Sequence, residues 1–436
     1  MDTPKIVVIG SSYSSAAVFH YIEKYLSKSR NPLDILFVRD KGCFFFDGLL
    51  YEYLCNSCNL SDLGQEFRKV GFFRSGISCL ETKVLEIDFK LKIVKTTSGD
   101  ISYKYLVLAP EKDLVDSELN LTLTNSFRCT TPSDILKLKS HIINNFEKIA
   151  TEEDLNKRKA LLTFSVLVNN IEGIEIACSV HDLVSELIKK HYPEVNPSFL
   201  KVNLIEQNNV LSNIKDPFSK NYLFHFINKK GVKIYANSKH ASIKNGQINI
   251  DSGQEIIAGT VIDGTLNKSS SLVKNLPLTK DGDLNVFVDL YLMAQGVEDV
   301  FVIGPAAKCV DLSDELVPSI KLLNEEAKIC SYNIFAKENS ISLKTLKPGI
   351  DIKCVSLGLR NSLVEIKNFY FTGLYGWIIN RLVYIWYFLG WQKKIKCLIN
   401  FLLHIFYLTD NTFLDVYEYK NSSEYELRMP KKKVNV

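Results

Sequence analysis

The stretch KIVVIGSSYSSAAVFHYIEKYL, residues 5–26, decides the fold of this chain. Its first residues form an apolar run that predicts a buried strand ending at Gly10. From Val18 to Leu26 an apolar side chain then recurs at every fourth position, which is helical spacing. A second apolar run, DILFV at 34–38, predicts the next strand. The chain therefore opens with a strand–helix–strand unit of the kind that binds nucleotides.

The same pattern returns further along the chain. LTFSVLV at 162–168 predicts a strand, the segment 173–190 a helix, and KVNLIE at 201–206 another strand. A late apolar run, VFVIG at 300–304, predicts a strand that ends at a glycine. Two such units with shared late strands predict an α/β fold with two Rossmann-like dinucleotide-binding domains.

The composition is that of an ordinary globular chain of 436 residues, with 46% hydrophobic and 23% charged residues. These values exclude disordered and collagen-like classes. The formal net charge of +4 is too small to argue for a nucleic-acid partner. At roughly 100–200 residues per domain, two or three domains are expected.

The segment 368–409 contains no acidic residue, and all three tryptophans fall inside it. Trp and Tyr favour the membrane–water interface, while Lys and Arg attract anionic headgroups. We expect two amphipathic helices here, at about 374–391 and 395–408, that dock on a membrane. The alternative is a helical pair packed on the body of the protein or on a second subunit. The residues expected to face the membrane are Trp377, Arg381, Trp386, Trp391, Lys393, Lys394 and Lys396.

The cysteines favour a reduced compartment. The chain has 10 of them without the spacing of a small secreted domain, so a disulfide framework is not expected. The first apolar run is too short for a signal peptide, and no uncharged apolar stretch reaches the ~18 residues of a transmembrane helix. We therefore expect a protein that lies peripherally on the cytoplasmic face of a membrane. The 7 histidines lack ligand spacing, so no metal site is predicted.

Six segments carry a family resemblance: FVRDKGCFFFDGLLYEYL (37–54), VNNIEGIEIA (168–177), KVNLIE (201–206), VFVIGPAAK (300–308), VPSIKLLNEEAK (317–328) and the aromatic segment 372–408. Together they resemble the type II NADH dehydrogenases, single-chain flavoproteins that pass electrons from NADH to quinone. The resemblance implies FAD as cofactor, NADH as substrate, quinone as electron acceptor and a membrane lipid surface as partner, and we expect a homodimer. It also implies a discontinuous FAD-binding-type domain at 1–115 and 282–345, an NAD(H)-binding-type domain at 116–281, and a C-terminal membrane-associating region at 346–436.

The first glycine-rich turn departs from the family. A pyrophosphate needs G-x-G-x-x-G, because the turn is tight and the backbone must come close to the phosphates. Gly10 is kept, while Ser12 and Ser15 occupy the other two positions. Either hydroxyl could donate to a phosphate oxygen, and the alternative is a turn without a ligand. The acid expected at the ribose falls on Arg39, which cannot accept a hydrogen bond, with Asp40 next to it.

The second turn departs further. Its glycine positions hold Val168, Asn170 and Gly173, which favours a turn that binds no pyrophosphate. Glu175 and Glu206 match the acids of the family. The resemblance gives Glu175 the catalytic place and lets Glu206 accept from the NADH ribose. A dipole role in the first turn of a helix also accounts for Glu175.

Three later places differ as well. Gly304 is followed by Pro305, where the family has an aspartate that binds the flavin's ribityl chain. Glu111 stands in a turn where a charge near a phosphate is unfavourable. The quinone-side glutamines of the family correspond to Lys321 and Glu325, an i,i+4 pair that is also typical of a solvated helix face.

Two functional hypotheses follow. The first is a FAD-dependent NADH:quinone oxidoreductase, and the second is a non-catalytic homologue that keeps the fold and membrane anchor as a binding or scaffold protein. A third hypothesis is a thiol-based redox protein that uses Cys55 and Cys58. In the first hypothesis the cofactor-binding residues are Gly10, Ser12, Ser15, Asp40 and Gly304 for FAD, and Gly173 and Glu206 for NADH.

Overall fold

A computed structural model of the chain consists of two compact units. The structure describes residues 6–26, 34–70, 77–110, 113–114, 125–206, 209–236, 238, 242–244, 247–249, 255–264, 268–269, 271–312, 319–347, 349 and 352–406. Among these, unit 1 comprises 6–49, 58–114 and 268–406, and unit 2 comprises 50–57 and 125–264.

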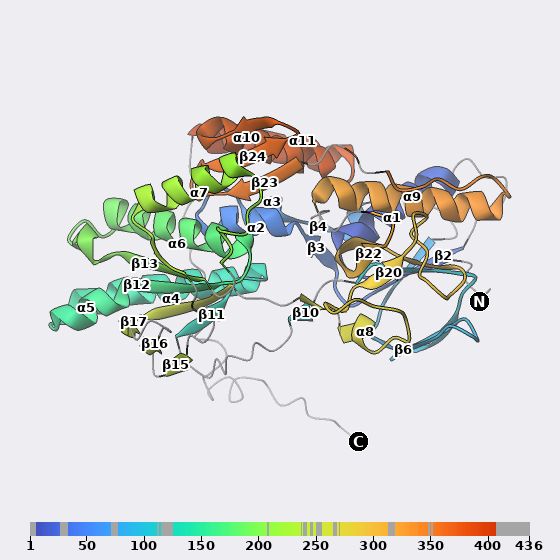
Figure 1. The fold of residues 1–436 in the computed structure, drawn as a ribbon, viewed down its shortest axis with the longest axis horizontal. Coiled ribbons are helices and arrows are strands. Elements are labelled where there is room, and N and C mark those ends of the chain that lie inside the picture. Colours follow the sequence, from blue (N-terminus) through green and yellow to red (C-terminus); the bar gives the residue numbers. More distant parts are fainter. Residues whose placement is uncertain are drawn as a thin grey trace, which may run out of the picture. The chain divides into compact units, whose positions relative to one another are not determined.

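Unit 1 is organised around a five-stranded parallel sheet with the order β21-β9-β1-β2-β5. Strand β2 of this sheet and the helices α1 and α9 are labelled in Figure 1. The central strand β1 is buried on both faces, which explains its continuous apolar run. Helix α1 follows it and packs against helix α9. The strands are β1 (Ile6–Ile9), β2 (Ile35–Arg39), β5 (Ile77–Glu81), β9 (Tyr105–Leu108) and β21 (Val300–Val302), and the helices are α1 (Tyr13–Leu26) and α9 (Ile320–Glu338).

Smaller sheets complete unit 1. They are the pair β3 (Cys43–Phe45) and β4 (Gly64–Glu66), the meander β6 (Val84–Asp88), β7 (Ile93–Thr96) and β8 (Gly99–Ser102), the pair β10 (Asp113–Leu114) and β19 (Lys268–Ser269), and the pair β20 (Val286–Val288) and β22 (Ala307–Cys309). The short helices are α3 (Leu60–Leu63), η1 (Phe67–Lys69), α8 (Ser271–Lys274) and η3 (Gly304–Ala306). Helix α2 (Asp47–Leu54) begins in unit 1 and ends in unit 2.

The C-terminal part of the described chain also belongs to unit 1. An antiparallel sheet of β23 (Ile352–Ser356), β24 (Ser362–Ile366) and β25 (Phe369–Phe371) precedes helices α10 (Gly373–Tyr387) and α11 (Trp391–Phe406). Helix α10 packs closely on β24, because a side chain at Gly376 would lie 2.2 Å from the carbonyl oxygen of Ser362. The predicted helix end at 408 lies outside the described residues.

Unit 2 has a second five-stranded parallel sheet, with the order β11-β18-β12-β13-β14. Its strands are β11 (Ser126–Arg128), β12 (Thr163–Val168), β13 (Lys201–Glu206), β14 (Lys233–Tyr235) and β18 (Thr260–Gly264). The helices are α4 (Pro132–Thr151), α5 (Leu155–Leu161), α6 (Ile171–Lys190), η2 (Pro197–Phe199) and α7 (Pro217–Lys230).

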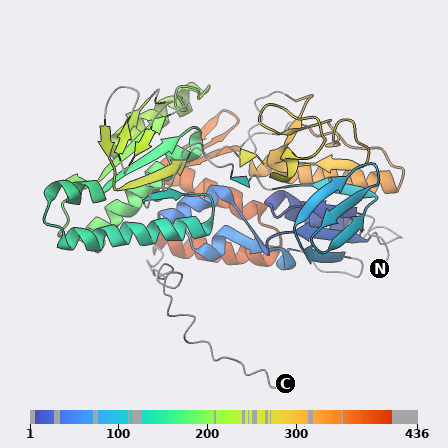
Figure 2. The same cartoon turned by 90° about the horizontal axis from the view of Figure 1, so that it is seen from below.

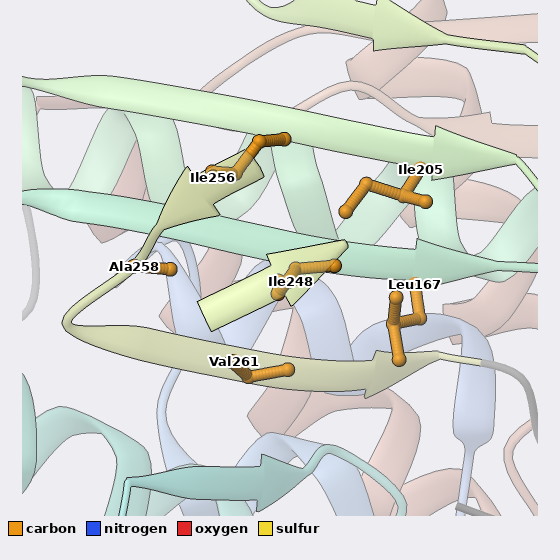
Figure 3. Close-up of a cluster of buried hydrophobic side chains, with 6 residues drawn as sticks. All are labelled: Leu167, Ile205, Ile248, Ile256, Ala258 and Val261. Atoms are coloured by element: carbon orange, nitrogen blue, oxygen red, sulfur yellow. The ribbon is translucent and has the colours of Figure 1, made fainter. Parts of the chain in front are cut away.

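A small antiparallel sheet of β15 (Ser242–Lys244), β16 (Gln247–Asn249) and β17 (Glu255–Ile257) covers one face of this sheet (Figure 2). Figure 3 shows the apolar cluster that joins the two sheets, in which Ile248 and Ile256 pack with Leu167, Ile205 and Val261. Burying such side chains contributes roughly 1.5–3 kcal/mol each.

The predicted fold class is confirmed: the structure is α/β, with two Rossmann-like sheets and a C-terminal helical pair. No helix among the described residues is long and apolar enough to cross a membrane.

Candidate functional site

The β1–α1 turn lies where the two halves of the unit 1 sheet diverge, since β1 pairs with β2 on one side and with β9 on the other. This is the position at which open α/β sheets bind ligands. Gly10 has φ +146°, and a Cβ there would lie 2.1 Å from the carbonyl oxygen of Ala109. Only glycine fits, so this part of the cradle is intact.

The serines of the turn bond to the protein itself. The Ser12 hydroxyl donates to the carbonyl oxygen of Ala109 at 2.9 Å and accepts from the Ser15 N–H at 3.4 Å. The Ser15 hydroxyl donates to the Ser12 carbonyl at 2.7 Å. Ser14 differs, because its hydroxyl is buried and has no hydrogen-bond partner among the described residues. A donor at this turn is therefore available from Ser14, which the sequence pattern did not single out.

The end of β2 holds the acid that the sequence placed near a ribose. The Ser11 hydroxyl donates to the Asp40 carboxylate and accepts from the Asp40 N–H at 3.2 Å and the Lys41 N–H at 3.3 Å. Arg39 is buried, with its guanidinium 5.6 Å from the ring centre of Phe67. Asp40 thus faces the first turn through Ser11, a contact that residue spacing alone did not reveal.

The turn after β21 is bound by a carboxyl group that sequence reasoning missed. The Gly304 N–H donates to Glu326 Oε2 at 2.7 Å. Burial raises the pKa of Glu326 to about 8. A Cβ at Gly304 would lie 2.8 Å from the Ser14 hydroxyl, so this turn touches the first turn of α1. Glu326 could have been found from helical spacing, because it lies on the buried face of α9 with Ala327 and Cys330.

The predicted quinone-side residues lie on the more exposed side of α9. Glu325 pairs with Lys328 at 3.7 Å, and Lys321 lies near Gly349. Between them Asn324 is buried and accepts from the hydroxyl of Tyr13 at 3.0 Å and from that of Tyr21 at 3.1 Å.

In unit 2 the β12–α6 turn is closed by its own residues. Asn170 caps α6, and its side chain accepts from the Gly173 N–H at 3.3 Å. A Cβ at Gly173 would lie 2.7 Å from both methyl groups of Val168. The glycine is therefore needed for the close packing of helix and strand, as in a dinucleotide turn.

The acids of unit 2 lie deeper than the sequence pattern indicated. Glu175 is buried in the second turn of α6, and the first-turn acid is Glu172, so the first-turn placement of Glu175 was wrong. Glu206 ends β13 and is 2% exposed. Its carboxylate accepts from the Leu211 N–H at 3.1 Å, and burial raises its pKa.

Helix α11 is attached through a side that carries both apolar and polar residues, since Cys397 and Phe401 are buried beside Asn400 and His404. Asn400 donates to the buried Asp62 carboxylate at 2.8 Å, and His404 lies 3.8 Å from the same carboxylate. Arg360 donates to the His404 carbonyl at 3.0 Å. The opposite side of the helix is apolar and faces solvent. Its side chains, 38% to 78% exposed, are Trp391, Ile395, Leu398, Ile399, Leu402, Leu403 and Phe406.

The tryptophans and cations of the tail divide into two groups. Trp386 is 73% exposed and lies 5.3 Å from Lys394 Nζ, Lys396 is exposed, and Lys393 donates to the Ser61 carbonyl. Trp377 is 1% exposed and packs on Phe401. Its predicted membrane contact is therefore wrong.

Arg381 was also predicted to face the membrane, and this is wrong because its side chain is only 4% exposed. Both buried positions lie on the face of α10 that packs into unit 1, which periodicity alone could not orient. A shallow cavity of about 350 Å³ is present on α11, lined by Trp391, Gln392, Ile395, Lys396, Ile399 and Asn400.

A family model described as pyridine nucleotide-disulphide oxidoreductase matches residues 4–323. The chain belongs to this family. It is 21% identical to the mitochondrial internal alternative NAD(P)H-ubiquinone oxidoreductase A1 of Arabidopsis thaliana, over 92% of this chain and 84% of that protein. It is 19% identical to the demethylphylloquinone reductase NdbB of Synechocystis sp., over 92% and 96% of the two chains.

Solved structures show the same fold as this oxidoreductase chain. NDH2 of Plasmodium falciparum, solved in complex with NADH, superposes with a TM-score of 0.79 over 94% of this chain and 100% of that one, at 14% identity. The sulfide:quinone oxidoreductase of Aquifex aeolicus gives a TM-score of 0.69 at 15% identity, over 94% and 96% of the chains. Together with the relatives, these matches confirm the predicted resemblance to type II NADH dehydrogenases.

Cys55 and Cys58 are buried, and their sulfurs lie 3.5 Å from the Glu52 carbonyl and 3.7 Å from the Leu49 carbonyl, respectively. A redox role that needs accessible thiolates gains no support from this burial. Glu111 lies outside the described residues. Within the described part of the chain, no group of three His, Cys, Asp or Glu side chains could hold a metal.

Proposed function

We propose that this chain is a peripheral membrane flavoprotein of the NADH:quinone oxidoreductase type. The observation that carries the proposal is the orientation of α11, which is attached to unit 1 through Phe401, Asn400 and His404 and leaves a row of apolar side chains exposed. The exposed apolar surface that runs from Trp391 to Phe406 along α11 needs a partner. A membrane also dissolves the quinone substrate, so docking would bring unit 1 to the source of its electron acceptor.

The β1–α1 turn fits the diphosphate of FAD at three points. Gly10 and Gly304 let the turn pack where a Cβ would clash with Ala109 and Ser14, and Ser14 holds a buried hydroxyl without a partner among the described residues. We assign the cradle to Gly10 and Gly304 and the hydroxyl donor to Ser14. Ser12, Ser15 and Asp40 would shape the turn through their internal bonds. FAD, when bound, supplies the hydride acceptor and the electron transfer that side chains cannot provide.

Unit 2 would hold NADH beside the β12–α6 turn. Gly173 lets the helix approach the strand, and Glu206 ends the neighbouring strand where a ribose would lie. For Glu206 to accept from a ribose hydroxyl, its carboxylate must exchange the Leu211 N–H for the ligand. Glu175 remains the proposed catalytic acid of this unit.

Quinone would be reduced beside the first turns of α9. Lys321 and Glu325 are half-buried there, and Asn324 ties the helix to α1 through Tyr13. The Tyr13 hydroxyl also lies 3.0 Å from the Tyr387 carbonyl at the end of α10. These contacts would link the quinone-side helix to the membrane-docking pair.

Docking would draw on both hydrophobic and electrostatic terms. Each large apolar side chain that leaves water contributes roughly 1.5–3 kcal/mol, and each cation near anionic lipid adds about 1 kcal/mol. Lys394 and Lys396 flank the exposed apolar face. The cytoplasmic face and the homodimer remain predictions from the sequence.

An absorbance spectrum of the purified protein tests the cofactor. Flavin bands with about one FAD per chain, together with quinone-dependent NADH oxidation, support the enzyme. A colourless protein that takes up no added FAD refutes it.

Flotation with anionic liposomes tests docking. The double variant Trp386→Ser/Trp391→Ser should leave the lipid fraction, because both side chains are largely exposed. Leu85→Ser, an exposed apolar position on β6, is the matched control and should float like the wild type. Unchanged flotation of the double variant would reject α11 as the anchor.

The second candidate function is a non-catalytic membrane-bound homologue. This candidate is favoured because side chains of the protein already accept backbone N–H groups at positions where a nucleotide could bind. The four side chains are those of Ser12, Asn170, Glu206 and Glu326. This candidate predicts flotation with liposomes but neither FAD uptake nor NADH oxidation. The same two experiments therefore separate the two functions.

A further inference from the structure

The Glu326–Gly304 contact lies at the carboxyl edge of the unit 1 sheet. Glu326 reaches from α9 to the first residue of η3, and the 2.7 Å bond to the Gly304 N–H is buried. On the other side of Gly304 is the unpartnered Ser14 hydroxyl of α1. One glycine therefore joins a buried carboxyl group to the turn that would receive a pyrophosphate.

We propose that Glu326 is a positioning residue that makes nucleotide binding at the first turn depend on its own protonation. As a neutral carboxylic acid it leaves a diphosphate free to approach Gly304 and Ser14. As a carboxylate, still accepting from the Gly304 N–H, it repels the phosphates. The inference rests on the proposed FAD site and names the residue that regulates it.

The surroundings of Glu326 contain little to balance a negative charge. The titratable groups coupled to it among the described residues are the thiols of Cys330 on the same helix and Cys309 on β22. Their pKa values are raised, chiefly by burial, so they stay neutral around pH 7–8. Tyr13 of α1, which donates to Asn324 on α9, is neutral as well, since burial raises its pKa well above the usual value.

A low-dielectric site of this kind strengthens repulsion between like charges. The carboxylate and a diphosphate would be close neighbours across Gly304. Among the described residues, no cation lowers the pKa of Glu326. Binding of FAD should therefore be coupled to proton uptake by Glu326. The expected affinity falls as pH rises through the pKa of about 8 that burial gives to Glu326.

The experiment is a calorimetric titration of the flavin-free full chain with FAD, which measures the affinity for FAD at pH 6, 7, 8 and 9. The wild type should bind FAD about tenfold more weakly at pH 9 than at pH 7, as expected for one linked proton. Glu326→Gln, which keeps an oxygen acceptor without a charge, should show little change. Glu86→Gln, an exposed carboxylate on β6 that pairs with Lys95, is the matched control and should behave like the wild type.

Equal pH dependence of FAD binding in the wild type and Glu326→Gln would overturn this inference and leave the FAD site standing. FAD binding that weakens above pH 8 in the wild type but not in Glu326→Gln would support it. Absence of binding in both proteins at every pH would overturn both the inference and the proposed function. Repeating the wild-type titration in buffers of different ionisation heat measures directly the protons taken up when FAD binds. This measurement does not need the variant, so it tests the inference even if Glu326→Gln does not fold. No proton uptake at pH 8 would overturn the inference.

Discussion

Replacing Glu326 by glutamine should change how the stability of unit 1 depends on pH. The carboxyl group is 6% exposed, and burial raises its pKa from 4.5 to about 8. Between these two values the folded state holds a proton that the unfolded state has lost. Stability from this group is therefore fully present below pH 4.5 and is lost as pH rises to about 8.

The size of the effect follows from the shift. A change from 4.5 to about 8 corresponds to ~5 kcal/mol, at 1.36 kcal/mol for each pKa unit. Glutamine is neutral throughout and can still accept from the Gly304 N–H. The stability of Glu326→Gln relative to the wild type should therefore rise by on the order of 3–5 kcal/mol between pH 5 and pH 9.

Urea denaturation followed by tryptophan fluorescence measures this difference. All three tryptophans belong to unit 1 and Trp377 is buried, so the signal reports on the unit that contains Glu326. Any pH-independent effect of the glutamine amide on the free energy of unfolding cancels, because the comparison uses only how that free energy changes with pH. Parallel stability curves for wild type and variant from pH 5 to pH 9 would refute the reasoning.

Three further substitutions test the packing of the two turns and the tail. Gly173→Ala should destabilise unit 2 by roughly 1–3 kcal/mol through overlap with Val168, and adding Val168→Ala should recover part of the loss in thermal denaturation; no recovery would argue against the overlap. Gly10→Ala should prevent folding of unit 1 or abolish FAD uptake, because its Cβ would lie 2.1 Å from the Ala109 carbonyl oxygen, and a folded variant with normal uptake would contradict this. Asn400→Ala should lower the free energy of unfolding by roughly 1–3 kcal/mol, since it removes the hydrogen-bond donor of the buried Asp62 carboxylate. Urea denaturation measures this, and an unchanged midpoint would contradict it.

The site was only partly predictable from residue types and spacing. Gly10 and Gly173 could be identified because a glycine at a fixed place after a strand has a mechanical role. Asp40 was found as the neighbour of Arg39, but its bond to Ser11 joins residues 29 positions apart, and no local pattern encodes it. Glu326 was passed over for the adjacent Glu325, because the choice between them depends on which side of α9 faces α1.

The C-terminal helices were likewise only partly predictable from the sequence. Their aromatic and basic content predicted a surface helical pair, and the order of residues predicted two helices close to those observed. The orientation could not be predicted, since α10 and α11 are apolar on more than one side. Trp377 and Arg381 turned inward, while Trp386 and Trp391 remained exposed.

By itself the sequence determined the alternation of strands and helices, the two Rossmann-like units and the character of the tail, because these follow from periodicity and from glycines at strand ends. Tertiary structure alone decided which side chains meet at the turns. Contacts such as Glu326 with Gly304 or Asn400 with Asp62 join residues far apart in the chain, and their energies depend on burial that only the packed molecule creates.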